Sequence, residues 1–148
     1  MSEFHFYHPI EVRYGDLDPQ GHVNNAKYLT YIEQARIKYI GQLGLWDGDS
    51  FLDIGIILAD ARITFQAPIL FGQRVRAGVR ISRLGNKSLT MEYRLEEIGS
   101  GKELASASTV LVAYDYHNKQ TIPIPQKWRQ VIAAFELLVE ETANGERA

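Results

Sequence analysis

Residues 14–25 read Tyr14-Gly15-Asp16-Leu17-Asp18-Pro19-Gln20-Gly21-His22-Val23-Asn24-Asn25, a polar stretch that leads directly into a long run with helical spacing. Apolar residues then recur at positions 28, 29, 32, 35, 39, 40 and 43, which predicts a helix that ends near Gly41 or Gly44. Asn24 or Asn25 is placed to cap this helix. The loop is therefore followed by a helix N-terminus, where unpaired backbone N–H groups and the helix dipole stabilise negative charge.

The rest of the chain predicts an antiparallel sheet around this helix. A strand over residues 6–14 precedes the loop, with Ile10, Val12 and Tyr14 on one face. Later strands are expected over 56–66, 75–82, 89–96 and 104–116, and the turn at 85–87 makes the middle two a hairpin. The last of these strands is apolar on both faces from Val110 to Val112, so we expect it to be central or at an interface. Beyond Pro125, apolar residues from Trp128 to Val139 predict an amphipathic terminal helix.

Composition excludes several classes of function. One domain over residues 1–148 is the natural expectation, with a frayed tail at about 140–148. A net charge of -2 argues against a nucleic-acid binder. No apolar run approaches the ~20 residues of a membrane span, and residues 1–5 lack the pattern of a secretory signal. The absence of cysteine excludes a thiol nucleophile, and it fits a cytoplasmic location. The histidines show no ligand spacing, so we expect no metal site.

The loop and helix resemble the hotdog-fold acyl-CoA thioesterases, in particular the 4-hydroxybenzoyl-CoA thioesterase type. That family carries Asp-x-Asp-x-x-Gly before a helix with an early tyrosine, which Asp16, Asp18, Gly21 and Tyr28 match. The likeness extends over most of the chain and includes the Ile122-Pro123-Ile124-Pro125 segment. It implies an α+β hotdog fold, in which a curved antiparallel sheet of five or six strands wraps a long central helix, plus a C-terminal helix. It also implies a hydrolase of acyl-CoA or acyl-carrier-protein thioesters, without a cofactor beyond the coenzyme A part of the substrate.

The resemblance assigns the attacking carboxylate to Asp18. Whether Asp18 acts as a nucleophile or as a general base on water stays open, and the structural alternative is an Asx turn before Pro19. The position of the oxyanion donor in the family falls on the backbone N–H of Asn25. Plant acyl-carrier-protein thioesterases use an acid, an asparagine two residues later and a histidine. Here Gln20 replaces that asparagine, so a full triad does not carry over, and His22 is retained as an assistant only.

Other residues have both a functional and a structural interpretation. Tyr28 lines the acyl pocket or belongs to the core, while Asp16 is interpreted as structural. Eight basic residues against three acids lie between Arg62 and Lys102, an excess of +5. This excess either holds the phosphates of coenzyme A, with Arg83 and Lys87 as the contacts, or forms a solvated sheet face.

Two expectations concern contacts at the surface. Glu33 and Arg36, three residues apart on the helix, are expected to form a surface or interface pair. Free sheet edges predict a homodimer or a dimer of dimers. A non-catalytic protein that binds acyl-CoA or acyl-carrier protein would share the fold and the ligand, and the presence of Asp18 counts against this alternative.

Overall fold

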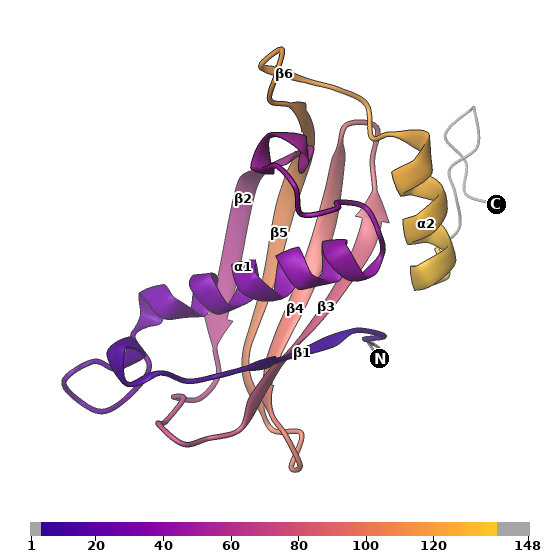
Figure 1. The fold of residues 1–148 in the computed structure, drawn as a ribbon. Coiled ribbons are helices and arrows are strands. Elements are labelled where there is room, and N and C mark those ends of the chain that lie inside the picture. Colours follow the sequence, from indigo (N-terminus) through magenta and orange to yellow (C-terminus); the bar gives the residue numbers. More distant parts are fainter. Residues whose placement is uncertain (1–3, 139–148) are drawn as a thin grey trace. The chain divides into compact units, whose positions relative to one another are not determined.

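The structure is a computed structural model that describes residues 4–138 (Figure 1). Helices and strands follow in the order β1 (Tyr7–Ile10), α1 (Asn25–Gln42), β2 (Ile56–Phe65), β3 (Val75–Leu84), β4 (Ser88–Glu97), β5 (Glu103–Asp115), β6 (Gln120–Thr121) and α2 (Gln126–Glu136). Short 3-10 turns cover Tyr14–Asp16 and Phe51–Asp53. The strands pair in the order β1-β3-β4-β5-β2, and β6 pairs with β5. The predicted α+β class, with a long first helix and a terminal helix, is confirmed.

The chain forms two compact units, and strands β2 to β5 contribute residues to both. The first unit contains the described part of residues 1–39 together with 62–80 and 92–108. The second contains 40–61, 81–91 and the described part of 109–148. The polar loop and most of α1 belong to the first unit. The single domain over 1–148 stays a prediction, and the proposed frayed tail at 140–148 lies outside the described residues.

The β3–β4 hairpin is confirmed in its pairing and in its faces. The apolar residues at every second position of the two strands are at most 2% exposed: Val75, Ala77, Val79 and Ile81 on β3, and Leu89, Met91, Tyr93 and Leu95 on β4. The Gly85 N–H donates to the Ser88 carbonyl oxygen at 2.7 Å and closes the turn. Apolar residues at every second position therefore identified the buried side of both strands correctly.

The first strand is shorter than predicted. β1 pairs with β3 only over Tyr7–Ile10, in antiparallel register with Ile10 opposite Val75 (Figure 1). Ile10 and Val12 are buried, but Tyr14 is 83% exposed, so its expected place on their face is wrong. The reason is that the chain leaves the extended conformation after Arg13 and enters the 3-10 turn that begins the loop.

β2 is exposed over most of its length. Its sequence alternates, so Ile57 and Phe65 share one face of the strand, yet these side chains are 40% and 45% exposed. β2 ends the strand order, and only Ile56 within it is buried. A period-two pattern distinguishes the two faces of a strand, but it does not tell whether another element covers either face. β5, by contrast, lies between β4 and β2, in the central place that its apolar stretch predicted.

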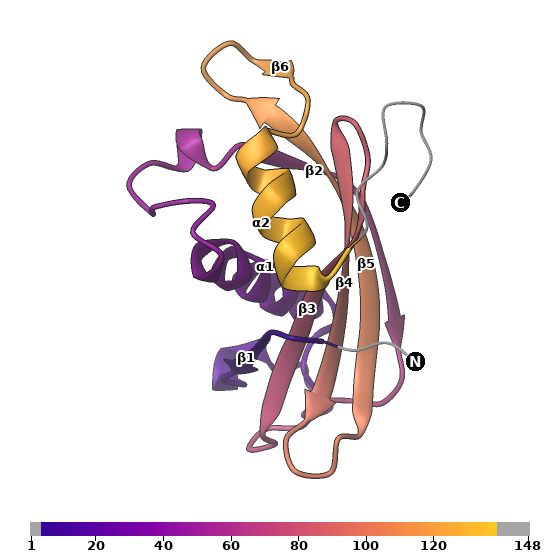
Figure 2. The same ribbon diagram turned by 90° about the vertical axis from the view of Figure 1, so that its right-hand side faces the viewer.

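The terminal helix belongs to the second unit and lies beside the end of β3 (Figure 2). Ile132 is fully buried, and the Glu136 carboxylate accepts a hydrogen bond from the Ile81 N–H at 3.0 Å. The helical spacing from Trp128 onward is confirmed, while Val139 lies beyond the described residues. Glu136 thus accepts a hydrogen bond from a backbone N–H of β3 that lies beyond the segment of β3 paired with β1.

Candidate active site

The loop between β1 and α1 is a tight turn held by its own backbone. Leu17 pairs with Val23, and the Asp18 N–H donates to the His22 carbonyl oxygen at 2.7 Å. Gly21 donates its N–H back to the Asp18 carbonyl and has a φ of +82°, in the left-handed region that favours glycine. The loop therefore presents its side chains from a fixed backbone.

Asp18 uses one carboxylate oxygen to hold this turn. Its Oδ1 accepts hydrogen bonds from the N–H groups of Gln20 at 2.9 Å and His22 at 3.1 Å. This geometry is the Asx turn expected from the structural interpretation. No donor within residues 4–138 bonds to Oδ2, and the side chain is half-buried. The carboxylate is thus oriented through one oxygen, while the other remains available.

Asn24 caps the helix that follows. Its Oδ1 accepts from the Ala26 N–H at 2.9 Å, and its own N–H donates to the Asp16 carbonyl at 2.8 Å. α1 begins at Asn25, and the described chain provides no acceptor for the Asn25 N–H. This amide therefore carries the positive end of the helix dipole and is free to bind an anionic oxygen.

A pocket of about 260 Å³ in the first unit brings these groups together. Four predicted site residues line it, namely Asp18, His22, Asn25 and Tyr28, and Val23 and the segment 65–68 complete it. Tyr28 is buried and packs edge to face against Phe65, with 4.9 Å between the ring centroids. Burial raises the pKa of Tyr28, the Ile69 backbone lowers it in part, and the charge of Asp18 raises it further. Tyr28 therefore remains a neutral phenol at neutral pH.

The sequence did not indicate that residues 65–68 would take part. The Val23 N–H donates to the Ile69 carbonyl at 2.8 Å, and His22 pairs with Leu70, so this segment is fixed against the loop. The strand ends before Pro68, which marks a turn in the sequence. Nothing in that local pattern identifies residues 22 and 23 as its neighbours, because the contact joins distant parts of the chain.

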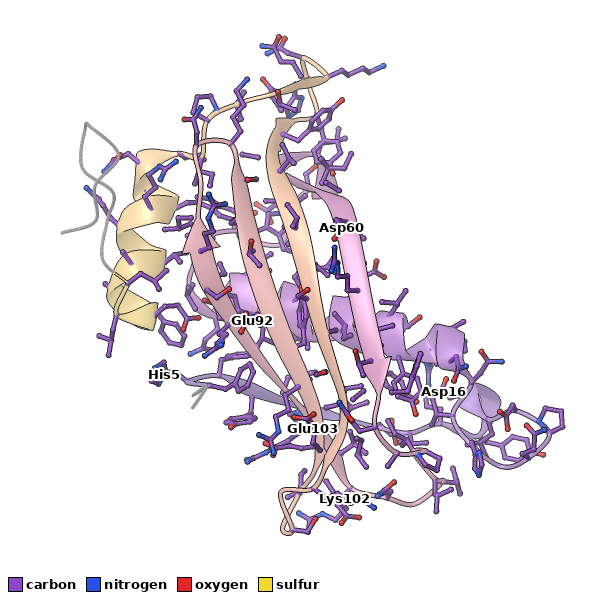
Figure 3. All side chains as sticks on the ribbon, turned by 180° about the vertical axis from the view of Figure 1, so that it is seen from behind. His5, Asp16, Asp60, Glu92, Lys102 and Glu103 are labelled. Carbon is purple, nitrogen blue, oxygen red and sulfur yellow. The ribbon has the colours of Figure 1, made fainter. Side chains whose placement is uncertain are left out.

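Asp16 is not among the residues that line the pocket, and it lies next to the start of α1 (Figure 3). Its side chain accepts hydrogen bonds from the Tyr31 hydroxyl at 2.7 Å and from the Arg13 N–H at 3.0 Å. Burial alone raises the pKa of Asp16, but these bonds and the charges of Lys27 and Arg13 outweigh burial and hold the pKa below its ordinary value. The pKa of Tyr31 rises through burial and through the same bond. These contacts favour the structural interpretation of Asp16.

Several basic residues of the 62–102 region are paired with acids. Arg76 and Arg94 approach Glu96, Arg94 also approaches Glu103, and Arg80 pairs with Glu92. Figure 3 shows Glu92 and Glu103 on the face of the sheet opposite α1. These pairs support the solvated-face interpretation for the three arginines.

Arg83 and Lys87 belong to the second unit. The residues that line the pocket do not include them. Both are exposed, and the Lys87 Nζ reaches the Thr121 Oγ1 at 3.4 Å.

The expected Glu33–Arg36 pair does not form within the described residues. Instead, the Arg36 Nε donates to the Tyr93 hydroxyl at 3.1 Å, because Arg36 reaches across to β4.

The described residues contain neither a metal-binding cluster nor a membrane-spanning helix. No three histidine, aspartate or glutamate side chains between residues 4 and 138 lie close enough to hold a metal ion. Over the same residues, no helix has the length and apolar character needed to cross a membrane.

Comparison with known proteins identifies the family. Residues 12–134 match the model of the thioesterase-like superfamily. The chain belongs to this superfamily. It is a thioester hydrolase, as the resemblance implied.

Individual relatives agree with this assignment. A Thermus thermophilus thioesterase, solved with coenzyme A and zinc, is 35% identical, has a TM-score of 0.81, and the match covers 92% of this chain and 97% of that chain. The 1,4-dihydroxy-2-naphthoyl-CoA hydrolase of Thermosynechococcus vestitus is 29% identical over 116 residues, 77% of this chain and 79% of the relative. The long-chain acyl-CoA thioesterase FadM of Escherichia coli is 25% identical over 130 residues, 82% of this thioesterase and 92% of FadM. The structural match confirms the predicted hotdog fold.

Proposed function

We propose that this thioesterase hydrolyses an acyl-CoA thioester in the pocket lined by Asp18 and Asn25. The observation that carries the proposal is the presence, in one pocket, of a carboxylate oxygen without a donor and a helix N-terminal amide without an acceptor among residues 4–138. The relatives named as CoA-thioester hydrolases support this choice of substrate. The reaction breaks the acyl C–S bond and transfers the acyl group to the oxygen of water, which yields a free acid and coenzyme A.

Thioester hydrolysis needs an attacking oxygen and a partner for the developing negative charge. In the proposed mechanism, the thioester carbonyl oxygen accepts from the Asn25 N–H, which stabilises the oxyanion. Asp18 Oδ2 either attacks the carbonyl carbon and forms a mixed anhydride that water then hydrolyses, or takes a proton from the attacking water. Both routes use the same oxygen. The thiol leaving group, with a pKa near ~8.5, departs without a strong general acid.

Other pocket residues would shape the reaction around this centre. We assign His22 an assisting role at the pocket wall and Tyr28 a role as a neutral, buried wall for the acyl group. Arg83 and Lys87 remain our predicted contacts for the coenzyme A phosphates. A carrier-protein thioester would present the same pantetheine arm and the same reacting bond, so the chemistry does not distinguish the two donors.

The decisive variant is Asp18→Asn. The asparagine side-chain oxygen can still accept both backbone N–H bonds of the turn, so the fold of the loop is retained while the negative oxygen is lost. We expect kcat for thiol release from an acyl-CoA panel to fall about 100-fold or more. Thermal unfolding should change little.

The matched control is Asp115→Asn. Asp115 Oδ1 also accepts two backbone N–H bonds, from His117 and Asn118, but this turn lies in the second unit. Its variant should keep full turnover. Equal turnover by wild type and Asp18→Asn would move the chemistry to another residue. Binding of acyl-CoA by a wild-type protein that releases no thiol would instead favour the non-catalytic alternative.

We also propose that the chain assembles as a homodimer, alone or within a dimer of dimers, through its β2 edge. β2 ends the strand order, and its apolar side chains Ile57 and Leu58 are exposed. A strand at the edge of a sheet with exposed apolar residues is a template for pairing with a second copy. A cytoplasmic location remains our expectation from the absence of cysteine.

A further inference from the structure

Asp16 connects the two ends of the loop between β1 and α1 through hydrogen bonds. We call these ends, residues 13–16 and Asn24, the stem of the loop. Its side-chain Oδ2 accepts from both the Tyr31 hydroxyl and the Arg13 N–H. Its backbone carbonyl accepts from the Asn24 N–H at 2.8 Å, and its backbone N–H donates to Arg13 at 2.9 Å. Asp16 therefore connects the end of the first strand segment, the cap of α1 and a side chain about two turns into α1.

The reactive groups of the proposed mechanism lie on either side of this stem. Asp18 follows Asp16 by two residues, in a loop whose own bonds make it a compact unit. Asn25 follows directly after Asn24, which is bonded to Asp16. The distance between the Asp18 carboxylate and the Asn25 N–H consequently depends on how the stem is held, and Tyr31 is its anchor within the helix.

The hydrogen bond between the Tyr31 hydroxyl and the Asp16 carboxylate is buried, and its acceptor is charged. Asp16 is 7% exposed and Tyr31 is 6% exposed. A carboxylate that stays ionised when buried requires donors, and bonds to a charged acceptor are stronger than those between neutral groups. Neither residue is among those that line the pocket, so a direct contact with the substrate is not part of the role inferred below.

We propose that the Asp16–Tyr31 hydrogen bond is a positioning device that sets the geometry between the Asp18 carboxylate and the Asn25 amide. The inference rests on the proposed function of these two groups. In this role Asp16 and Tyr31 affect the chemical step and not the affinity for the substrate, because misplacement of reacting groups acts on the transition state.

Tyr31→Phe removes the hydroxyl oxygen and leaves the ring. We expect kcat to fall about 10- to 100-fold, with KM changed by less than about twofold. The control is Tyr116→Phe, which also deletes a tyrosine hydroxyl bond, in that case to the Ile56 carbonyl in the second unit. The control should also lose stability, though less because its acceptor is a neutral carbonyl, and it should keep its kcat.

Asp16 allows a test by a conservative variant. Both bonds to its side chain fall on one oxygen, so the amide oxygen of Asp16→Asn can accept both of them, whereas Asp16→Ala accepts neither. We expect the kcat of Asp16→Asn to lie nearer to wild type and that of Asp16→Ala to match Tyr31→Phe. A merely structural role predicts that kcat tracks the melting temperature across the variants.

A readout without turnover separates this inference from the proposed function. In Tyr31→Phe, amide hydrogen exchange at Asn24 and Asp18 should accelerate about tenfold relative to Val79, whose N–H donates to Phe6 in the same unit. The inference is overturned if Tyr31→Phe matches Tyr116→Phe in both kcat and amide exchange. If exchange accelerates but Asp18→Asn keeps full turnover, the positioning stands and the assignment of Asp18 fails.

Discussion

The two carboxylate oxygens of Asp18 have different roles. Oδ1 accepts two backbone N–H groups and thereby holds the turn, while Oδ2 has no donor within the described chain. The structural and catalytic interpretations of this residue are consequently compatible. An oriented carboxylate loses less freedom in reaching the transition state, so the turn itself contributes to the proposed reactivity.

Asp16 leads to a prediction about pH. Its hydrogen bonds hold its pKa below the ordinary value, so the unfolded chain binds this proton more readily than the folded chain. The stabilising contribution is present above the unfolded pKa of about 3.9, and it is lost as pH falls through the lower folded pKa. Urea unfolding of wild type and Asp16→Asn should show that the difference in free energy of unfolding narrows from pH 6 towards about pH 3. Other carboxylates titrate in both proteins, so a constant difference would contradict the role of Asp16.

Among the pocket residues, the sequence predicted those that lie in one continuous segment of the chain, residues 18–28. Asp18, His22, Asn25 and Tyr28 line the same pocket because a short loop and the first turn of a helix cannot place them far apart. Phe65 and Pro68 were missed because their contact with the loop is tertiary. Their own neighbourhood in the sequence indicates only the end of a strand. The catalytic roles themselves stay predictions.

Among the elements, β1 illustrates how a glycine accommodates aromatic rings. Tyr7 lies opposite Gly78 on β3, and the Phe4 ring packs over the same position. A Cβ on Gly78 would lie 2.9 Å from Phe4 and 3.1 Å from Tyr7. The rings also face cations, since the Arg76 guanidinium lies 3.8 Å from the Tyr7 centroid.

Gly78→Ala should therefore destabilise the protein by about 1–3 kcal/mol, because the added methyl group displaces both rings. Gly41→Ala is the matched control, since a Cβ there meets nothing within 4 Å and the residue lies near the end of α1. Alanine is the better helix former, so this variant should gain up to about 1 kcal/mol. Urea denaturation measures both changes. A Gly78→Ala protein as stable as wild type would show that the rings move aside at no cost.

The elements that were predicted best are those with a covered face. The β3–β4 hairpin has a turn signal and two buried rows of side chains, so local chemistry and tertiary packing agree. β1 and β2 lie at the two ends of the strand order, where neighbours are missing on one side. Their alternating sequences resemble those of central strands. The length of β1 and the exposure of β2 were set by contacts that the local pattern does not contain.

For the whole molecule, the strand order leaves two unequal edges. β1 pairs over four residues and contains Pro9, which cannot donate a ladder bond, so that edge is short and protected. β2 has ten residues, and its exposed side chains include Ile57 and Leu58. A strand of this length without proline would form a continuous ladder with the β2 strand of a second copy, which covers the β2 edge of both copies at once.

The proposed dimer is tested by adding a charge to this edge. Leu58→Lys places an ammonium group on a side chain that is 46% exposed in the single chain, so the fold of the chain should tolerate it, while burial against a partner would be costly. Sedimentation should give twice the chain mass of 16.8 kDa, or a multiple of it, for wild type and a single chain for Leu58→Lys. Leu137→Lys is the control, because Leu137 is 78% exposed at the end of α2 and should leave the assembly unchanged. If Leu58→Lys stays dimeric at the same micromolar concentration, the copies associate through a surface other than β2.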